Sequence, residues 1–124
     1  MRHLLLILSS FLLLSTLSAQ SKADELIKFS ESAHTFGKVK KGTPVTYEFN
    51  FVNPGSKPLV IEDATAECGC TKPEYPTKAI LPGKSGKIKV TYDAKEGGAF
   101  TKKVTVKLVN VADTKVLTIS GEVI

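Results

Sequence analysis

Tryptophan is absent from the 124-residue chain, and cysteine occurs only twice, at Cys68 and Cys70. The first two residues hold the only methionine and the only arginine, and one of the two histidines is His34. The missing tryptophan and the lack of a long-range cysteine pair argue against the antibody type of immunoglobulin domain. The scarcity of histidine, methionine and cysteine leaves few ligands for a zinc or copper site.

The charge of the chain is modest and positive. Its 17 basic residues face 12 acidic residues, which gives a formal net charge of +5. Removal of a leader that contains Arg2 would leave 16 lysines against 12 acids, a charge of +4. Without arginine the chain lacks the side chain that makes bidentate contacts with phosphate and guanine. We therefore expect no nucleic-acid partner.

Residues 1–19 have the composition of a secretory signal peptide. A basic start precedes an uncharged, mostly apolar run from Leu4 to Leu17, and small and polar residues follow. This run of about 14 residues is shorter than the roughly 20 that a membrane-spanning helix needs. We predict cleavage after Ala19, export to the periplasm or out of the cell, and no stable membrane span after cleavage.

Most of the remaining chain alternates apolar and polar residues, the pattern of a strand with one buried face. A short strand is also predicted at 59–61, and residues 23–29 can be read as a helix or as a first strand. The apolar positions with strand spacing are 45, 47, 49 and 51, then 88, 90 and 92, then Phe100, Val104, Val106 and Leu108, and finally Leu117, Ile119 and Val123.

About seven short strands in about 100 residues predict an all-β fold, an antiparallel immunoglobulin-like β-sandwich. An open barrel is the alternative. We expect a signal peptide at residues 1–19, a lead-in segment at 20–33 and the sandwich at 34–124. Residues 116–124 are the expected free edge of the sandwich, because they end the chain.

Short motifs occur in a fixed order along the expected sandwich. They are residues 34–42 (HTFGKVKKG), 49–55 (FNFVNPG), 58–61 (PLVI), 68–71 (CGCT), 81–86 (LPGKSG), 90–93 (VTYD) and 98–100 (GAF). With these motifs the chain resembles, over residues 34–124, the bacterial exported family of unknown function numbered 1573. The resemblance implies an immunoglobulin-like fold related to hydin-type and major-sperm-protein-like domains, and no established activity. Glu67 departs from the small residue that the family often has there.

The two cysteines raise the main chemical question. Apolar or small residues at 64, 66, 68 and 70 have the opposite parity from those at 59 and 61. This change near Glu62 and Asp63 predicts a bulge or a crossing between sheets. In an extended segment the Cα atoms of Cys68 and Cys70 would lie roughly 6.5–7 Å apart, at the upper limit for a disulfide. Gly69 permits a tighter turn that brings the sulfur atoms within reach.

Four interpretations of Cys68 and Cys70 stay open. Two cysteines in an oxidising compartment ordinarily pair, so a local disulfide is the first. The second is a soft-metal site in which two thiolates hold Cu(I). The third is thiol–disulfide exchange, which needs a lowered thiol pKa. The fourth is a reduced, buried pair that packs as small hydrophobic side chains.

No catalytic set of residues accompanies the cysteines. His34 is the one histidine after the leader, and the spacing gives it no nucleophile or acid partner. The sequence therefore predicts a non-enzymatic, exported module without a cofactor, which binds another envelope protein or a surface polymer through a sheet face or an edge strand. Copper or thiol handling by Cys68 and Cys70 is the alternative function.

Overall fold

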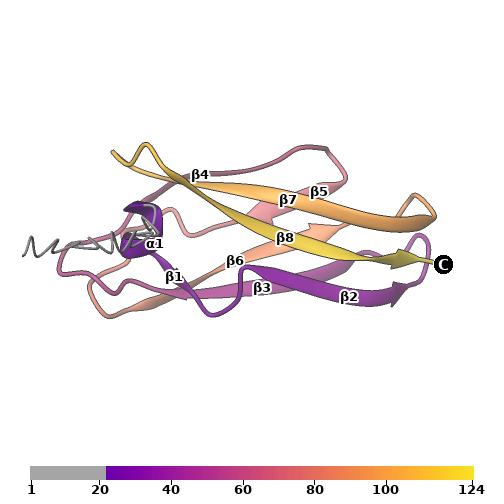
Figure 1. The fold of residues 1–124 in the computed structure, drawn as a ribbon, viewed down its shortest axis with the longest axis horizontal. Coiled ribbons are helices and arrows are strands. Elements are labelled where there is room, and N and C mark those ends of the chain that lie inside the picture. The colour runs from indigo at the N-terminus through magenta and orange to yellow at the C-terminus, as the bar shows by residue number, and fades with distance from the viewer. Residues whose placement is uncertain (1–21) are drawn as a thin grey trace, which may run out of the picture.

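The computed structural model describes residues 22–124, and the predicted signal peptide and its cleavage site lie outside this part of the chain. One helix and eight strands follow one another: α1 (Lys22–Leu26), β1 (Lys28–Phe29), β2 (Ala33–Val39), β3 (Val45–Val52), β4 (Ile61–Ala66), β5 (Thr71–Glu74), β6 (Ser85–Tyr92), β7 (Gly98–Leu108) and β8 (Thr114–Val123). They form two four-stranded sheets, ordered β1-β3-β6-β5 and β2-β8-β7-β4, that pack face to face (Figure 1). The predicted immunoglobulin-like β-sandwich is confirmed.

The alternation of apolar residues places one face of each long strand in the core. Phe49 and Phe51 of β3 are buried, and so are Ile88, Val90 and Tyr92 of β6. The inward positions of β7 and β8 are buried in the same way. Each large apolar side chain removed from water contributes about 1.5–3 kcal/mol, so this alternation supplies the main driving force for the sandwich.

The bounds predicted for the strand at 59–61 are wrong, but the change of parity predicted near Glu62 and Asp63 is right. Only Ile61 belongs to β4, because Leu59 lies in an isolated bridge outside the named strands. The pairing of β4 with β7 shifts register between Ile61 and Asp63, which confirms the predicted bulge. As a result Ile61 and Ala64 both face the core, although they are three positions apart, an odd number that would place them on opposite faces of a regular strand.

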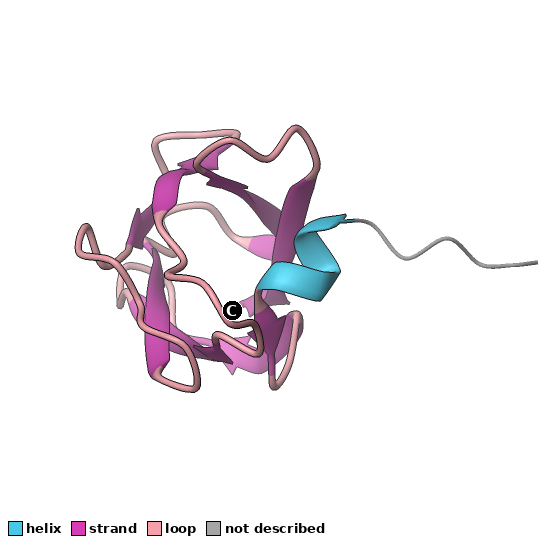
Figure 2. Cartoon of the chain, turned by 90° about the vertical axis from the view of Figure 1, so that its left-hand side faces the viewer, coloured by secondary structure: helices cyan, strands magenta, loops and turns pink. Residues whose placement is uncertain are grey.

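The first elements of the described chain pack into the sandwich. Residues 23–29 contain both of the structures that their sequence allows, α1 and then β1. Ile27 is buried, and β1 pairs with β3 through Lys28 and Phe29. Helix α1 lies at one end of the sandwich, beside the loops that close this end (Figure 2). After β1 the chain changes sheets, and β2 pairs in parallel with β8.

Strand β8 is an inner strand of its sheet. It pairs with β2 on one side and with β7 on the other. The expectation that residues 116–124 form a free edge is therefore wrong. The order of strands along the chain does not set their order in a sheet, since strands far apart in sequence can pair. The edges are instead β1, β5, β2 and β4.

Each sheet contains a glycine beneath a phenylalanine ring of the neighbouring strand. Gly86 is the direct partner of Phe51, and Gly121 is the direct partner of Phe100. A Cβ atom on Gly121 would lie 2.8 Å from the Gly37 carbonyl oxygen and 2.9 Å from ring atoms of Phe100. The rings thus fill the space that the missing side chains leave, which lets two large rings pack inside a small sandwich.

We expect Gly121→Ala to lower the free energy of unfolding by about 1–3 kcal/mol, because the added methyl group meets a backbone carbonyl and a buried ring. Urea unfolding followed by circular dichroism measures the change. Gly97→Ala is the matched control, because a Cβ atom at Gly97 meets nothing within 4 Å. Its effect should stay within about 0.5 kcal/mol. Equal effects of the two substitutions would contradict this account of Gly121.

Candidate functional site

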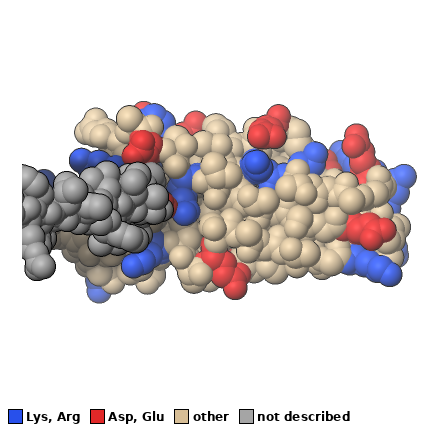
Figure 3. All heavy atoms as spheres, in the orientation of Figure 1, with Lys and Arg blue, Asp and Glu red and all other residues tan. Residues whose placement is uncertain are grey.

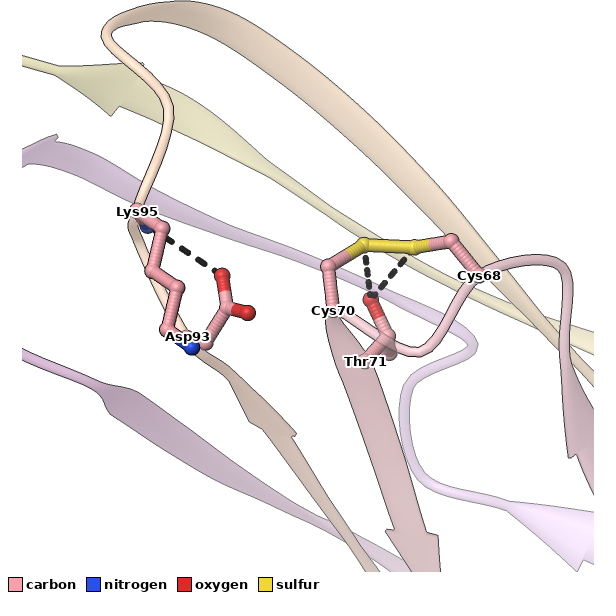
Figure 4. Close-up of a disulfide and its surroundings, with 5 residues drawn as sticks. All are labelled: Cys68, Cys70, Thr71, Asp93 and Lys95. Carbon is pink, nitrogen blue, oxygen red and sulfur yellow. Dashed lines mark hydrogen bonds between the residues drawn. A yellow bond between two sulfur atoms is a disulfide. The ribbon is translucent and has the colours of Figure 1, made fainter.

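The two cysteines lie in the loop that joins β4 to β5 and carries the chain from one sheet to the other (Figure 4). The structure joins Cys68 and Cys70 by a disulfide, with a Cα–Cα distance of 5.2 Å. The Thr71 N–H donates to the Cys68 carbonyl oxygen over 3.3 Å, so the segment turns here. The turn explains why the Cα atoms lie closer together than in an extended segment, within the usual range for a disulfide.

Thr71 provides a hydroxyl group beside both sulfur atoms. The hydroxyl of the buried Thr71 lies 3.8 Å from the Cys68 Sγ atom and 3.6 Å from the Cys70 Sγ atom. The Asp93 N–H donates to the Cys70 carbonyl oxygen over 3.0 Å. The Asp93 carboxylate accepts the Lys95 N–H over 3.1 Å (Figure 4). In the described part of the chain, no group of three or more His, Cys, Asp or Glu side chains is placed to hold a metal ion.

We expect the exported protein, isolated without reductant, to contain no free thiol and to be lighter than the reduced chain by two hydrogen atoms. The reason is that neighbouring cysteines pair in an oxidising compartment. Alkylation and intact-mass measurement, with and without reductant, test this. The Cys68→Ser/Cys70→Ser variant controls for alkylation of other groups. Two alkylated cysteines in the absence of reductant would contradict the disulfide.

Each of the four edge strands carries a feature that limits its pairing with another chain. β1 has only two residues, and β5 has four residues that include Pro73, which has no N–H. β4 is bulged between Ile61 and Asp63, and β2 shifts register between Thr35 and Lys38. These strands are therefore poor templates for an added strand.

β1 covers only one half of the outer side of β3. It pairs with Val52 and Phe51, and the Ser30 N–H donates to the Asn50 carbonyl oxygen over 3.0 Å. Beyond Ser30 the chain crosses to the other sheet. Residues 45–49, which we call the open β3 edge, therefore have no neighbouring strand on their outer side within the described chain.

The hydrogen-bonding direction along β3 identifies the free groups of this edge. Successive residues of an antiparallel strand point their N–H and C=O groups to opposite sides. Because the Asn50 carbonyl points to the β1 side, the main-chain groups of Glu48 and Thr46 point there too. Those of Tyr47 and Phe49 point to β6. No residue of the described chain pairs with the main chain of Thr46 or Glu48 on the outer side.

An aromatic cluster of His34, Phe36 and Tyr47 lies beside the open β3 edge. His34 and Phe36 come from β2 and Tyr47 comes from β3, so the cluster joins the two sheets. The His34 and Tyr47 rings stack with centroids 3.6 Å apart, and the Phe36 ring meets His34 edge-on at 4.8 Å. All three residues are only half-buried. Part of this aromatic surface is thus exposed to solvent.

Glu31, in the segment that connects β1 to β2, forms a hydrogen bond with this cluster. The Tyr47 hydroxyl donates to the Glu31 carboxylate over 2.5 Å. This hydrogen bond raises the pKa of Tyr47, because ionisation of the phenol would break it; burial and the Glu31 charge act in the same direction. Tyr47 therefore stays a neutral hydrogen-bond donor at ordinary pH.

We expect the amide protons of Thr46 and Glu48 to exchange with deuterium much faster than those of Tyr47 and Phe49. The first pair points to solvent, whereas the second pair donates to β6. Two-dimensional NMR of the mature protein in deuterated buffer measures the four rates under identical conditions. Protection of all four amides to a similar degree would contradict an open edge at residues 45–49.

Charge does not single out another site. Lysines and acidic residues are interspersed over the face shown in Figure 3, without a large patch of one sign. Several of them form exposed pairs between neighbouring strands, such as Lys87 with Glu48 and Lys107 with Glu62. Such exposed pairs contribute about 0–1 kcal/mol each. Within residues 22–124, no helix has the length and apolar character to cross a membrane.

The sandwich has an immunoglobulin-like fold, similar to the folds of PapD-like and MSP-domain structures. The PapD-like domain 7 of human CEP192 superposes with a TM-score of 0.66 at 10% identity, over 86% of this chain and 91% of that chain. SSP-19 of Caenorhabditis elegans, described as an MSP-domain protein like family member, gives 0.57 at 17% identity, over 73% and 94% of the two chains. At these identities the likeness shows the fold alone.

The chain belongs to the family described as Protein of unknown function (DUF1573), whose model matches residues 27–123. The predicted family is therefore confirmed, and the match includes β1. A protein of unknown function from Porphyromonas gingivalis W83 has a TM-score of 0.68 at 15% identity, over 79% of this chain and 46% of that chain. The chain thus spans less than half of that relative's length. No curated protein matches the chain.

The sequence pointed to Cys68 and Cys70, but it did not identify the open β3 edge. Thr46 and Glu48 look like ordinary outward residues of an amphipathic strand. The one signal in the sequence is the polar break at residues 30–32, between two short apolar segments. It marks a place where the chain can leave a sheet, but it does not indicate that β3 then has no neighbouring strand at residues 45–49.

Proposed function

We propose that this protein is an exported, non-enzymatic binding module, without a cofactor, that takes up an extended polypeptide segment as an additional strand beside β3. The observation that carries the proposal is the unpaired main chain of Thr46 and Glu48 on the outer side of β3, in a sandwich whose edge strands are short, bulged, shifted in register or interrupted by proline. An extended peptide offers donors and acceptors at the same spacing, which a lipid or a glycan does not. The partner is then another envelope protein.

Two further features support this proposal. The signal-peptide pattern of residues 1–19 fits a protein that acts in the periplasm or outside the cell. The half-buried rings of His34, Phe36 and Tyr47 add apolar surface beside the free main-chain groups. Main-chain pairing supplies affinity in this mode of binding, and contacts of alternate side chains supply selectivity.

Thiol or copper handling at Cys68 and Cys70 is the second candidate. The observation that favours it is the Thr71 hydroxyl, which reaches both sulfur atoms and can donate a hydrogen bond to a thiolate. This hydroxyl would stabilise whichever thiolate forms when the disulfide is attacked by an external thiol. For copper, Cys68 and Cys70 would supply two thiolates after reduction.

We expect peptides selected on the immobilised mature protein from a displayed random 12-residue library to lose at least about tenfold in affinity on Thr46→Pro. Proline removes the outward N–H of residue 46 but leaves the β3–β6 ladder intact. Thr46→Ala is the matched control: both variants lose the hydroxyl bond to Thr91, but only alanine keeps the N–H, so its affinity should change by no more than about twofold.

Circular dichroism and thermal unfolding of both variants verify that the sandwich forms. Binders that tolerate Thr46→Pro in a folded domain would contradict capture at the open β3 edge. The absence of any enriched peptide would contradict it as well, because an exposed edge that functions in strand addition accepts main chain of many sequences.

A further inference from the structure

The open β3 edge has two chemically different ends. At one end Glu31 follows the last residue that bonds to β3 from the β1 side. At the other end the loop of residues 40–44 enters β3 and carries Lys40 and Lys41, both exposed and without an ion pair in the described chain. The edge therefore has the Glu31 carboxylate on the β1 side and, at the Val45 end, two lysines without ion pairs in the described part of the chain.

Charged groups of both signs surround the end of the edge that carries Lys40 and Lys41. Lys38 also lies there, and Glu122 is its partner in the β2–β8 register. The Lys41 N–H donates to the Ile124 O atom over 3.1 Å, which brings the last residue to the same end. The Gly42 N–H donates to the Ala94 carbonyl oxygen over 2.8 Å, so the charged residues Asp93, Lys95 and Glu96 lie near this end as well. Among the charged groups of this end, Lys40 and Lys41 are exposed and form no ion pair within residues 22–124.

The line of β1 gives the direction of an added strand. β1 runs antiparallel to β3, from Lys28 opposite Val52 to Phe29 opposite Phe51. A segment that continues this line runs toward Val45 and ends beside Lys40 and Lys41. A parallel segment would place its C-terminal end beside Glu31 instead. Opposite charges across such an interface favour one orientation and disfavour the other.

The two faces of the added strand meet different surroundings. Residues opposite Thr46 and Glu48 would form the hydrogen-bonded pairs and point their side chains to the solvent, as Thr46 and Glu48 do. Residues opposite Val45, Tyr47 and Phe49 would point between the sheets, where the aromatic cluster lies. The inward positions therefore favour apolar side chains, and the outward positions favour polar ones.

A second copy of this chain would bring a second layer to the same place. β2 lies at the edge of the facing sheet, and His34 and Phe36 reach from it to the cluster beside β3. A β3 strand from a second sandwich would run antiparallel to β3 together with its own facing sheet, and that sheet would meet β2. A single extended segment has no second layer. The edge position of β2 in the facing sheet thus favours a lone strand over a dimer.

Resting on the proposed function, we infer that the captured segment is a lone extended strand, antiparallel to β3, with apolar residues at alternate positions and acidic residues at its C-terminal end. The apolar side chains cover His34, Phe36 and Tyr47. The acidic end pairs with Lys40 and Lys41. The partner is thus defined by its chemistry, as an amphipathic and C-terminally acidic segment of an envelope protein.

The test uses the peptides selected on the wild-type protein, each synthesised in its original and in its reversed sequence. We expect the original peptides to alternate apolar and polar residues, and the reversed peptides to bind at least about fivefold more weakly.

The Lys40→Glu/Lys41→Glu variant should bind the original peptides at least about fivefold more weakly at low salt, with a smaller loss of affinity at high salt. Lys57→Glu/Lys103→Glu, which makes the same change in net charge elsewhere, should change their affinity by no more than about twofold. Fluorescence anisotropy measures all of these affinities.

The outcomes separate this inference from the proposed function. Peptides that depend on the residue-46 N–H, but bind equally well when reversed or on the Lys40→Glu/Lys41→Glu variant, would overturn the inference and leave strand capture standing. Peptides indifferent to Thr46→Pro would overturn both. Sedimentation of the protein as a dimer that Thr46→Pro dissociates would overturn the lone-strand occupant in favour of a second copy.

Discussion

The parallel pairing of β2 with β8 is the interaction on which the rest of the structure depends. It takes residues 33–39 out of the sheet that β1 begins, and it places the last strand of the chain inside the other sheet. The backbone bond from Ile124 to the Val39 carbonyl oxygen closes this ladder. Because one short stretch of chain cannot pair in both sheets, the gain of a neighbour for β8 is the loss of a neighbour for β3.

β8 and β3, the two strands next to this change of sheets, have different neighbours. At the start of β8 the small helix α1 packs against the sandwich, and the Lys115 ammonium group lies 2.7 Å from the Asp24 carboxylate. Along the open β3 edge, the contacts with β2 within the described chain are made by side chains, chiefly by the stacked rings of His34 and Tyr47. An unpaired edge exposes main-chain groups that water must satisfy. This asymmetry is the physical reason for proposing that a partner binds at the open β3 edge.

Much of the fold could be predicted from the sequence, because burial of one strand face imposes a period of two. The strands around Phe49, Ile88 and Leu117 were predicted in this way, and the change of parity near Asp63 predicted the bulge. The predicted bounds of the strand at 59–61 were wrong because Leu59 and Val60 are apolar but lie outside β4. In the sequence, such a pair cannot be distinguished from the start of a strand. The cysteines were found as a pair, and the turn at Gly69 was one of the two geometries allowed.

The sequence by itself determined the family, the β-sandwich and the residues that face its core, since side-chain alternation is a local property of each strand. It also singled out Cys68 and Cys70 as the candidate residues for any chemistry. Only the tertiary structure decided that β8 is an inner strand and that Thr46 and Glu48 lack main-chain partners. Strand neighbours are chosen by long-range packing, and the energy of that choice is spread over both sheets. No single segment of the sequence therefore records it.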